Sequence, residues 1–112
     1  MAFKRSAQRQ VVVKRGRRGG GGYAFAAEGA DVSADVQPMS GEMAQRMYGL
    51  EPEQMRRLLA AAGADIRPGD GVCVGVEAGA APDYRVTYVA KWMRHTEAHL
   101  RWIPPAQRGA DA

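Results

Sequence analysis

The chain has 112 residues, of which 46% are hydrophobic and 25% are charged, a composition typical of one globular domain. No apolar run approaches the roughly 18 residues that a membrane span needs, and the first residues lack an apolar stretch of signal-peptide length. The single cysteine, Cys73, excludes an internal disulfide, so nothing indicates an oxidising compartment and we expect a cytoplasmic protein.

The charge is unevenly distributed. The formal net charge is +4, yet residues 1–18 hold seven of the sixteen cations and no acid, which leaves nine cations against twelve acids for the remainder. A basic arm on a mildly acidic body favours a polyanion or an acidic surface as its neighbour. The simpler interpretation is a solvated, charged strand edge that resists unwanted pairing.

The first predicted strand covers residues 7–15 and ends in three consecutive valines and two cations. Four consecutive glycines follow, so we expect a long mobile loop over residues 15–29. Tyr23 and Phe25 are unusual in a plain linker, and they are candidate anchors of this loop on a neighbouring subunit. The alternative is that both rings fold back onto their own domain.

A second strand is predicted over residues 31–36, before Pro38, and a short helix over residues 40–49. Ser40 is a suitable N-cap and Gly49 a suitable C-terminal residue for that helix. Residues 53–63 are ambiguous, because their composition favours a helix whereas tertiary context can override so short a preference.

The pattern of the residues after position 63 predicts β-structure. Residues 67–70, Arg-Pro-Gly-Asp, match a type II turn, and valines then alternate at positions 72, 74 and 76. Residues 84–90 form a predicted strand with Tyr84, Val86 and Tyr88 on one face. A last strand follows up to residue 103, with Ala98, Leu100 and Trp102 on one face, and residues 104–112 are expected to be a frayed tail. The sequence therefore predicts a single domain over residues 1–112, mainly β: a small antiparallel β-barrel with a long flexible Gly-rich loop and at most one or two short helices.

Residues 95–99, His-Thr-Glu-Ala-His, resemble a metal site at first sight. On a strand, however, same-face side chains lie about 6.6–6.8 Å apart, so the two histidines would be about 13 Å apart and too distant for one ion with bonds of ~2 Å. The glycine run lacks the Lys of a phosphate-binding loop, and no serine lies in a recognisable nucleophile motif. We therefore expect no enzymatic activity, no metal and no cofactor.

Arg15, Arg17 and Arg18 beside the glycine run are typical of segments that contact phosphates without reading sequence. They are candidate DNA-facing residues. No recognition-helix or RNA-binding motif accompanies them, so non-specific proximity to DNA is the most that they predict.

Three stretches in a fixed order carry a family resemblance: residues 36–52 (VQPMSGEMAQRMYGLEP), residues 64–72 (ADIRPGDGV) and residues 84–101 (YRVTYVAKWMRHTEAHLR). Their recurring positions are Val36, Pro38, Met39 and Ser40, then Tyr48, Gly49 and Pro52, then Asp65, Ile66, Gly69 and Asp70, and finally Tyr84 through Leu100. Together they cover roughly residues 30–102. In this order the chain resembles the head-closure, or stopper, proteins of long-tailed bacteriophages and phage-like particles.

The resemblance implies a small β-barrel that forms a homo-oligomeric ring in the neck of a virion, assembled in the cytoplasm of a bacterial host. Such a ring lies between portal or adaptor proteins on the head side and a tail terminator or tail tube on the other. It closes the exit channel of double-stranded DNA after packaging. The resemblance also implies a strand rather than a helix over residues 53–63, and it makes Trp92, His95 and Glu97 candidate structural or interface residues.

Two classes of function follow. The first is a structural virion protein, a head–tail connector of stopper type, with an adaptor or a tail terminator as the nearest alternatives. The second is a small basic-armed β-barrel that binds nucleic acid non-specifically on its own.

Overall fold

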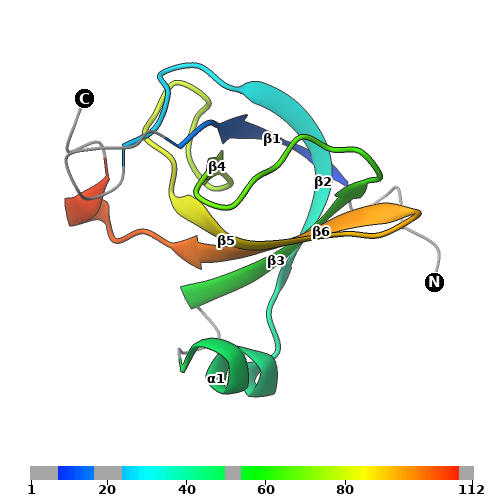
Figure 1. The fold of residues 1–112 in the computed structure, drawn as a ribbon. Coiled ribbons are helices and arrows are strands. Elements are labelled where there is room, and N and C mark those ends of the chain that lie inside the picture. The colour runs from blue at the N-terminus through cyan, green and yellow to red at the C-terminus, as the bar shows by residue number, and fades with distance from the viewer. Residues whose placement is uncertain (1–7, 17–23, 50–53, 109–112) are drawn as a thin grey trace.

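The structure is a computed structural model that describes residues 8–16, 24–49 and 54–108. Its elements, in chain order, are β1 (Arg9–Lys14), β2 (Ala30–Pro38), α1 (Gly41–Tyr48), β3 (Met55–Ala61), β4 (Gly71–Cys73), β5 (Tyr84–Lys91), β6 (His95–Trp102) and a 3-10 helix, η3 (Pro105–Gln107). The strands form a closed antiparallel barrel in the order β1-β2-β3-β6-β5-β4 (Figure 1). The predicted fold class is therefore confirmed.

The diameter of a barrel grows with its number of strands, and the interior of this six-stranded barrel is filled by side chains. The buried core consists of Val11, Val13, Ala34, Leu58, Ala60, Ile66, Val72, Tyr84, Val86, Ala98 and Leu100. Ile66 belongs to the connection between β3 and β4 rather than to a strand, and it is 1% exposed. The connection thus supplies core volume that the three-residue strand β4 cannot.

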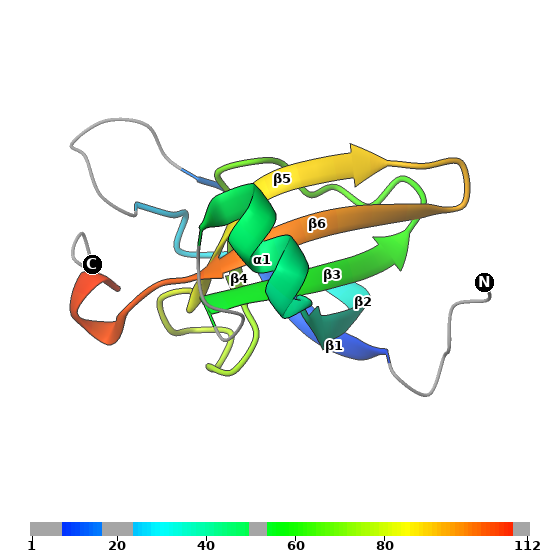
Figure 2. The same ribbon diagram turned by 90° about the horizontal axis from the view of Figure 1, so that it is seen from below.

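Helix α1 lies outside the barrel, across the outer face of β3, β6 and β5 (Figure 2). Ser40 Oγ accepts a hydrogen bond from the Met43 N–H at 3.1 Å, and Gly49 ends the helix with a φ of 65°, so both predicted caps are confirmed. The helix packs on the sheet through a second small core of Met39, Ala44 and Met55. Met47, one turn after Met43, stays exposed.

The ambiguous segment is a strand. β3 is hydrogen-bonded to β2 on one side and to β6 on the other, with Leu58 opposite both Val36 and Ala98. Because both edges of the strand are paired and its inward side chains fill the core, tertiary pairing overrides the helical preference of Leu, Ala and Arg.

Two details differ from the sequence-based predictions. The alternation of valines 72, 74 and 76 does not continue as a strand, because β4 ends at Cys73 and the Asp83 carboxylate accepts the N–H groups of Val74 and Gly75 at 2.8 Å each. Tyr88 does not share the core face with Tyr84 and Val86. A bulge between Val86 and Tyr88 inserts one residue, which moves Tyr88 to the outer face of the barrel.

The turn at residues 67–70 has the predicted form. Gly69 has a φ of 93°, and the Asp70 N–H donates to the Arg67 carbonyl at 3.1 Å. In the predicted tail, η3 follows β6, and the Arg108 guanidinium lies 5.4 Å from the Trp102 ring centroid and donates to the Ile103 carbonyl. Residues 109–112 lie outside the described residues.

Candidate assembly surface

The connection between β5 and β6, residues 91–95, forms a projecting hairpin tip. Met93 is 93% exposed and Trp92 is 56% exposed, and the flanking Lys91 and Arg94 are exposed as well. The turn is held by a hydrogen bond from the Trp92 N–H to the His95 carbonyl at 2.8 Å. Two large apolar side chains at the end of a protruding turn are typical of a contact surface rather than of a solvated loop.

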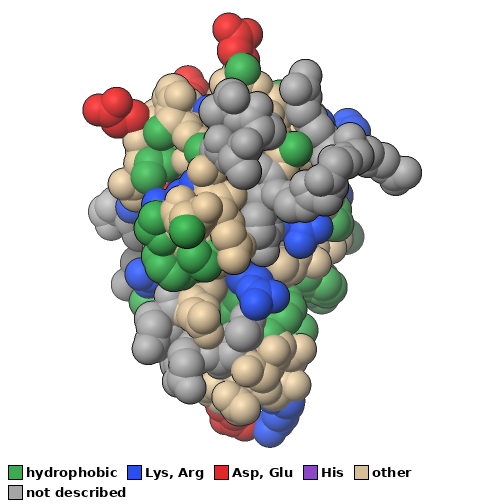
Figure 3. Space-filling model, turned by 90° about the vertical axis from the view of Figure 1, so that its left-hand side faces the viewer, with side chains coloured by type: hydrophobic (Ala, Val, Ile, Leu, Met, Phe, Trp, Pro, Cys, Tyr) green, Lys and Arg blue, Asp and Glu red, His purple; other side chains and the backbone are tan. Residues whose placement is uncertain are grey.

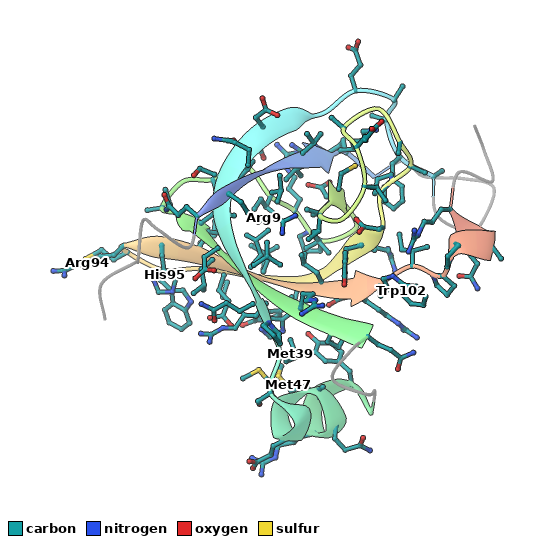
Figure 4. All side chains as sticks on the ribbon, turned by 180° about the vertical axis from the view of Figure 1, so that it is seen from behind. Arg9, Met39, Met47, Arg94, His95 and Trp102 are labelled. Carbon is teal, nitrogen blue, oxygen red and sulfur yellow. The ribbon has the colours of Figure 1, made fainter. Side chains whose placement is uncertain are left out.

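The His95 side chain packs on the hairpin tip. Its ring stacks on the Trp92 ring with a centroid separation of 6.3 Å and an interplanar angle of 28°. Figure 4 places His95 and Arg94 at one end of the molecule and Trp102 at the opposite end. The hairpin tip is therefore a feature of one end only.

Glu97 serves a different role, in a polar cluster beneath α1 that also contains Arg57, His99 and Tyr48. Glu97 Oε2 accepts from His99 Nε2 at 3.0 Å, and Glu97 Oε1 accepts from Arg57 Nη2 at 3.2 Å. Arg57 Nε lies 3.2 Å from Oε2, close enough for an ion pair but not aligned for a hydrogen bond. His99 Nδ1 lies 2.7 Å from the Tyr48 hydroxyl, so the cluster joins β3, β6 and α1.

The environment of Glu97 acts on its pKa in two directions. Burial raises the pKa, but the hydrogen bonds and charges of Arg57 and His99 outweigh burial, so the net pKa lies below its ordinary value of 4.5. The carboxyl is therefore held ionised, as a fixed acceptor that orients His99. This is a structural arrangement, because the His99 ring is buried between sheet and helix.

The sequence did not indicate Arg57, His99 and Tyr48 as partners. Alternation along a strand places His95, Glu97 and His99 on one face, and that signal was present. The residues that face them on the neighbouring strand could not be predicted, because Arg57 belongs to the segment whose secondary structure was ambiguous. The helix that brings Tyr48 over the sheet has no sequence signal for its docking position.

Arg15, predicted to face DNA, is engaged within the domain. Its Nη1 lies 2.8 Å from the Asp70 carboxylate, which is 2% exposed, and its Nη2 lies 2.8 Å from Asp65. Asp70 also accepts from the backbone N–H groups of Gly16 and Arg67. Arg15 thus fixes the exit of β1 against the turn before β4, and contact with DNA stays a prediction for Arg15. Arg17 and Arg18 lie outside the described residues.

Phe25 packs on its own domain. It forms a bridge with Gly16, and the Ala26 N–H donates to the Arg15 carbonyl at 2.8 Å. Its ring is half-buried beside Gly71, where an added Cβ would lie 2.9 Å from Phe25 Cδ1. Anchoring of a neighbouring subunit by Phe25 stays a prediction, and Tyr23 lies outside the described residues.

At the end away from the hairpin tip, residues 24–30 and 76–82 form two alanine-rich loops that we call the alanine loops. They meet at Gly71, where an added Cβ would contact both Phe25 of the first loop and Pro82 of the second. Lys14 joins them: its Cγ lies against Gly29 and its buried ammonium donates to the Ala80 carbonyl at 2.8 Å. Figure 3, which views this end, shows acidic side chains standing out above an apolar area.

Cys73 lies beneath the second alanine loop. It is 4% exposed, and its thiol lies 3.7 Å from the Ala80 carbonyl. Burial raises the pKa of this thiol, the charge of Lys14 opposes that change, and Asp83 adds to it. The thiol is therefore a small core group and not an activated nucleophile.

No protein-family model, no curated protein and no solved structure matches the chain. Within the described residues, no helix is both long and apolar enough to cross a membrane. The case for a function therefore rests on the residues and their geometry.

Proposed function

We propose that the protein is a head–tail connector of stopper type, a ring-forming structural protein of a virion neck. Two observations support the proposal together. The sequence resemblance over residues 30–102 implies a small β-barrel, and the chain folds as one. The stretch from Tyr84 through Leu100, which contributes most to the resemblance, forms the β5–β6 hairpin with its exposed tip.

The exposure of Trp92 and Met93 is the single observation that carries the proposal. Both side chains lie at the end of a two-stranded projection, where they add nothing to the core of their own barrel. Large exposed apolar side chains on a rigid projection favour insertion into a partner. An assembly protein needs a contact surface of this kind.

In this function the ring lies below the portal and adaptor proteins and presents a platform for the tail terminator or tail tube. Double-stranded DNA ends in its channel and is contacted through phosphates only. Arg17 and Arg18 are the candidate contacts, since the guanidinium of Arg15 already pairs with Asp65 and Asp70.

Loss of the gene in the particle that encodes the protein tests the proposal. We expect DNA-filled heads that lack tails and that lose DNA, seen by electron microscopy, with a wild-type copy restoring tailed particles. The purified protein should form rings at high concentration, detected by native mass spectrometry. Normal tailed particles without the gene would refute the connector function.

The second candidate, a barrel that binds nucleic acid alone, is favoured by one feature, the seven cations of residues 1–18. Within the described part of this arm, Lys14 and Arg15 bind groups of the barrel, and Arg9 donates to the Val74 carbonyl. Tight, salt-dependent binding of free duplex DNA by a stable monomer would favour this candidate over the first. An adaptor or tail-terminator role would be indicated by the position of the ring in a particle reconstruction.

A further inference from the structure

The exposed charges beside the hairpin tip and those in the alanine loops have opposite sign, whereas further exposed charged residues, Asp31, Arg85 and Arg101, lie on the strands. Among the described residues, Lys91 and Arg94 flank the apolar hairpin tip, and residues 87–96 contain no acid. Glu28 and Glu77 are exposed in the alanine loops, and neither has an ion-pair partner within the described chain. Figures 1 and 2 both place the hairpin tip at one end and these loops at the other.

The apolar parts of the two ends also complement each other in size. The tip presents two large side chains, Trp92 and Met93. The alanine loops present small ones, in the sequences AAEGA at residues 26–30 and VEAGAAP at residues 76–82, each with one glutamate. Small side chains leave room for a large aromatic and a flexible thioether, and the glutamates are opposite in sign to the cations that flank the tip.

The loops form a supported surface. They touch at Gly71, and the buried Lys14 cation ties them together through Gly29 and Ala80. The carboxylate of the buried Asp83 accepts the N–H groups of Val74 and Gly75 just before the second loop. Glu28 and Glu77 are the charged residues of the two loops.

We propose that the hairpin tip of one copy docks onto the alanine loops of a second copy, with Trp92 and Met93 against the small side chains of the loops and with Lys91 and Arg94 on Glu28 and Glu77. The contact is heterologous, because a donor surface at one end meets a different acceptor surface at the other. A heterologous contact closes into a ring when the rotation between neighbouring copies is a whole fraction of a full turn, and otherwise the copies extend as a filament. This inference rests on the proposed ring function and specifies the surfaces that build the ring.

Charge reversal tests the inference. Self-association is measured by sedimentation velocity and native mass spectrometry for the wild type, a tip variant (Lys91→Glu with Arg94→Glu), a loop variant (Glu28→Lys with Glu77→Lys) and the chain with all four changes. We expect the tip and loop variants each to associate more weakly, on the order of tenfold. The variant with all four changes should regain most of the wild-type association, because the charges on both surfaces have changed sign. All of the substituted side chains are exposed, and thermal unfolding verifies that the variants fold.

A matched control reverses the exposed ion pair of α1, Glu42→Lys with Arg46→Glu, which should leave association unchanged. A third variant, Trp92→Ala with Met93→Ser, should weaken association without changing the pattern of charge.

Three results would overturn the inference. The tip variant or the loop variant could associate as strongly as the wild type, or the variant with all four changes could associate no more strongly than the tip and loop variants. Rings that persist in the tip and loop variants would overturn the docking surfaces and leave the connector function standing. A wild-type chain that stays monomeric at all concentrations would overturn the docking surfaces, and tailless particles on gene loss would still support the connector.

Discussion

The hydroxyl of Tyr48, at the end of α1, lies 2.7 Å from Nδ1 of His99 in the middle of β6. The two rings also meet edge to face at a centroid separation of 5.9 Å. His99 Nε2 is held by Glu97, and Glu97 by Arg57, so one chain of hydrogen bonds and charges runs from the outer surface of β3 to the helix. The helix is therefore docked both by this polar contact and by packing against Met39 and Met55.

Removal of the Tyr48 hydroxyl should loosen this docking. We expect Tyr48→Phe to lower the free energy of unfolding by about 1 kcal/mol, because a buried imidazole nitrogen loses its partner while the ring packing is kept. Chemical denaturation measures the change. Tyr88→Phe is the matched control, since Tyr88 also contacts His99 with its ring but is exposed. Equal stability of the two variants would contradict the role of the Tyr48 hydroxyl.

The lowered pKa of Glu97 makes the cluster sensitive to acid. Because the folded state favours the ionised carboxyl, its stabilising contribution is present above pH 4.5 and is lost as the pH falls through the lowered pKa of the folded state. The stability difference between wild type and Glu97→Gln should therefore shrink as the pH falls from about 6 to about 3. Urea unfolding at each pH measures it. Arg57→Gln should flatten the same dependence, and an unchanged slope in that variant would count against the pairing.

Asp70 should contribute far more than Asp65 to the free energy of unfolding, although both carboxylates contact Arg15. Asp70 is buried and accepts two backbone N–H groups besides the guanidinium, whereas Asp65 is exposed. We expect Asp70→Ala to cost about 3 kcal/mol in unfolding free energy, since buried donors are left without partners. The cost of Asp65→Ala should stay below about 1 kcal/mol. Thermal and urea unfolding measure both variants. Similar losses of unfolding free energy would show that the buried contacts of Asp70 contribute no more than the exposed pair of Asp65.

The left-handed backbone of the turn before β4 gives a further test. Gly69→Ala should destabilise by about 1–2 kcal/mol, because a Cβ disfavours the φ of 93°. Nothing within 4 Å obstructs a side chain there, so the expected loss is conformational rather than steric. Gly79→Ala is the control, with open space and no positive φ. Equal stability of the two variants would argue against the strained turn.

Much of the fold could be predicted because it follows local rules. The caps at Ser40 and Gly49, the turn at Gly69 and the strands of alternating residues all depend on neighbouring positions. β3 needed the family resemblance, since Leu58, Leu59 and Ala60 favour a helix until both edges of the strand are paired. The bulge that turns Tyr88 outward depends on pairing with His99 and had no local signal.

The site was predicted less completely. The sequence identified Trp92 and His95, and the structure brings their rings together at the hairpin tip. It also identified Glu97 as a candidate structural or interface residue, and the structure shows Glu97 paired with Arg57 and His99 beneath the helix. The meeting of the alanine loops had no sequence signal, because Phe25 and Pro82 are distant in the chain and come together only where both lie beside Gly71.

The three-residue strand β4 has a consequence for how the chain folds. The β5–β6 hairpin and the β1–β2 pair join residues close in sequence, so their loop-closure entropy is small. By contrast, β4 pairs Val72 with Val13, across most of the intervening chain, through very few hydrogen bonds. We therefore expect barrel closure at β4 to be the late, entropically costly step of folding, and hydrogen exchange at the β4 amides would measure how readily the barrel opens there.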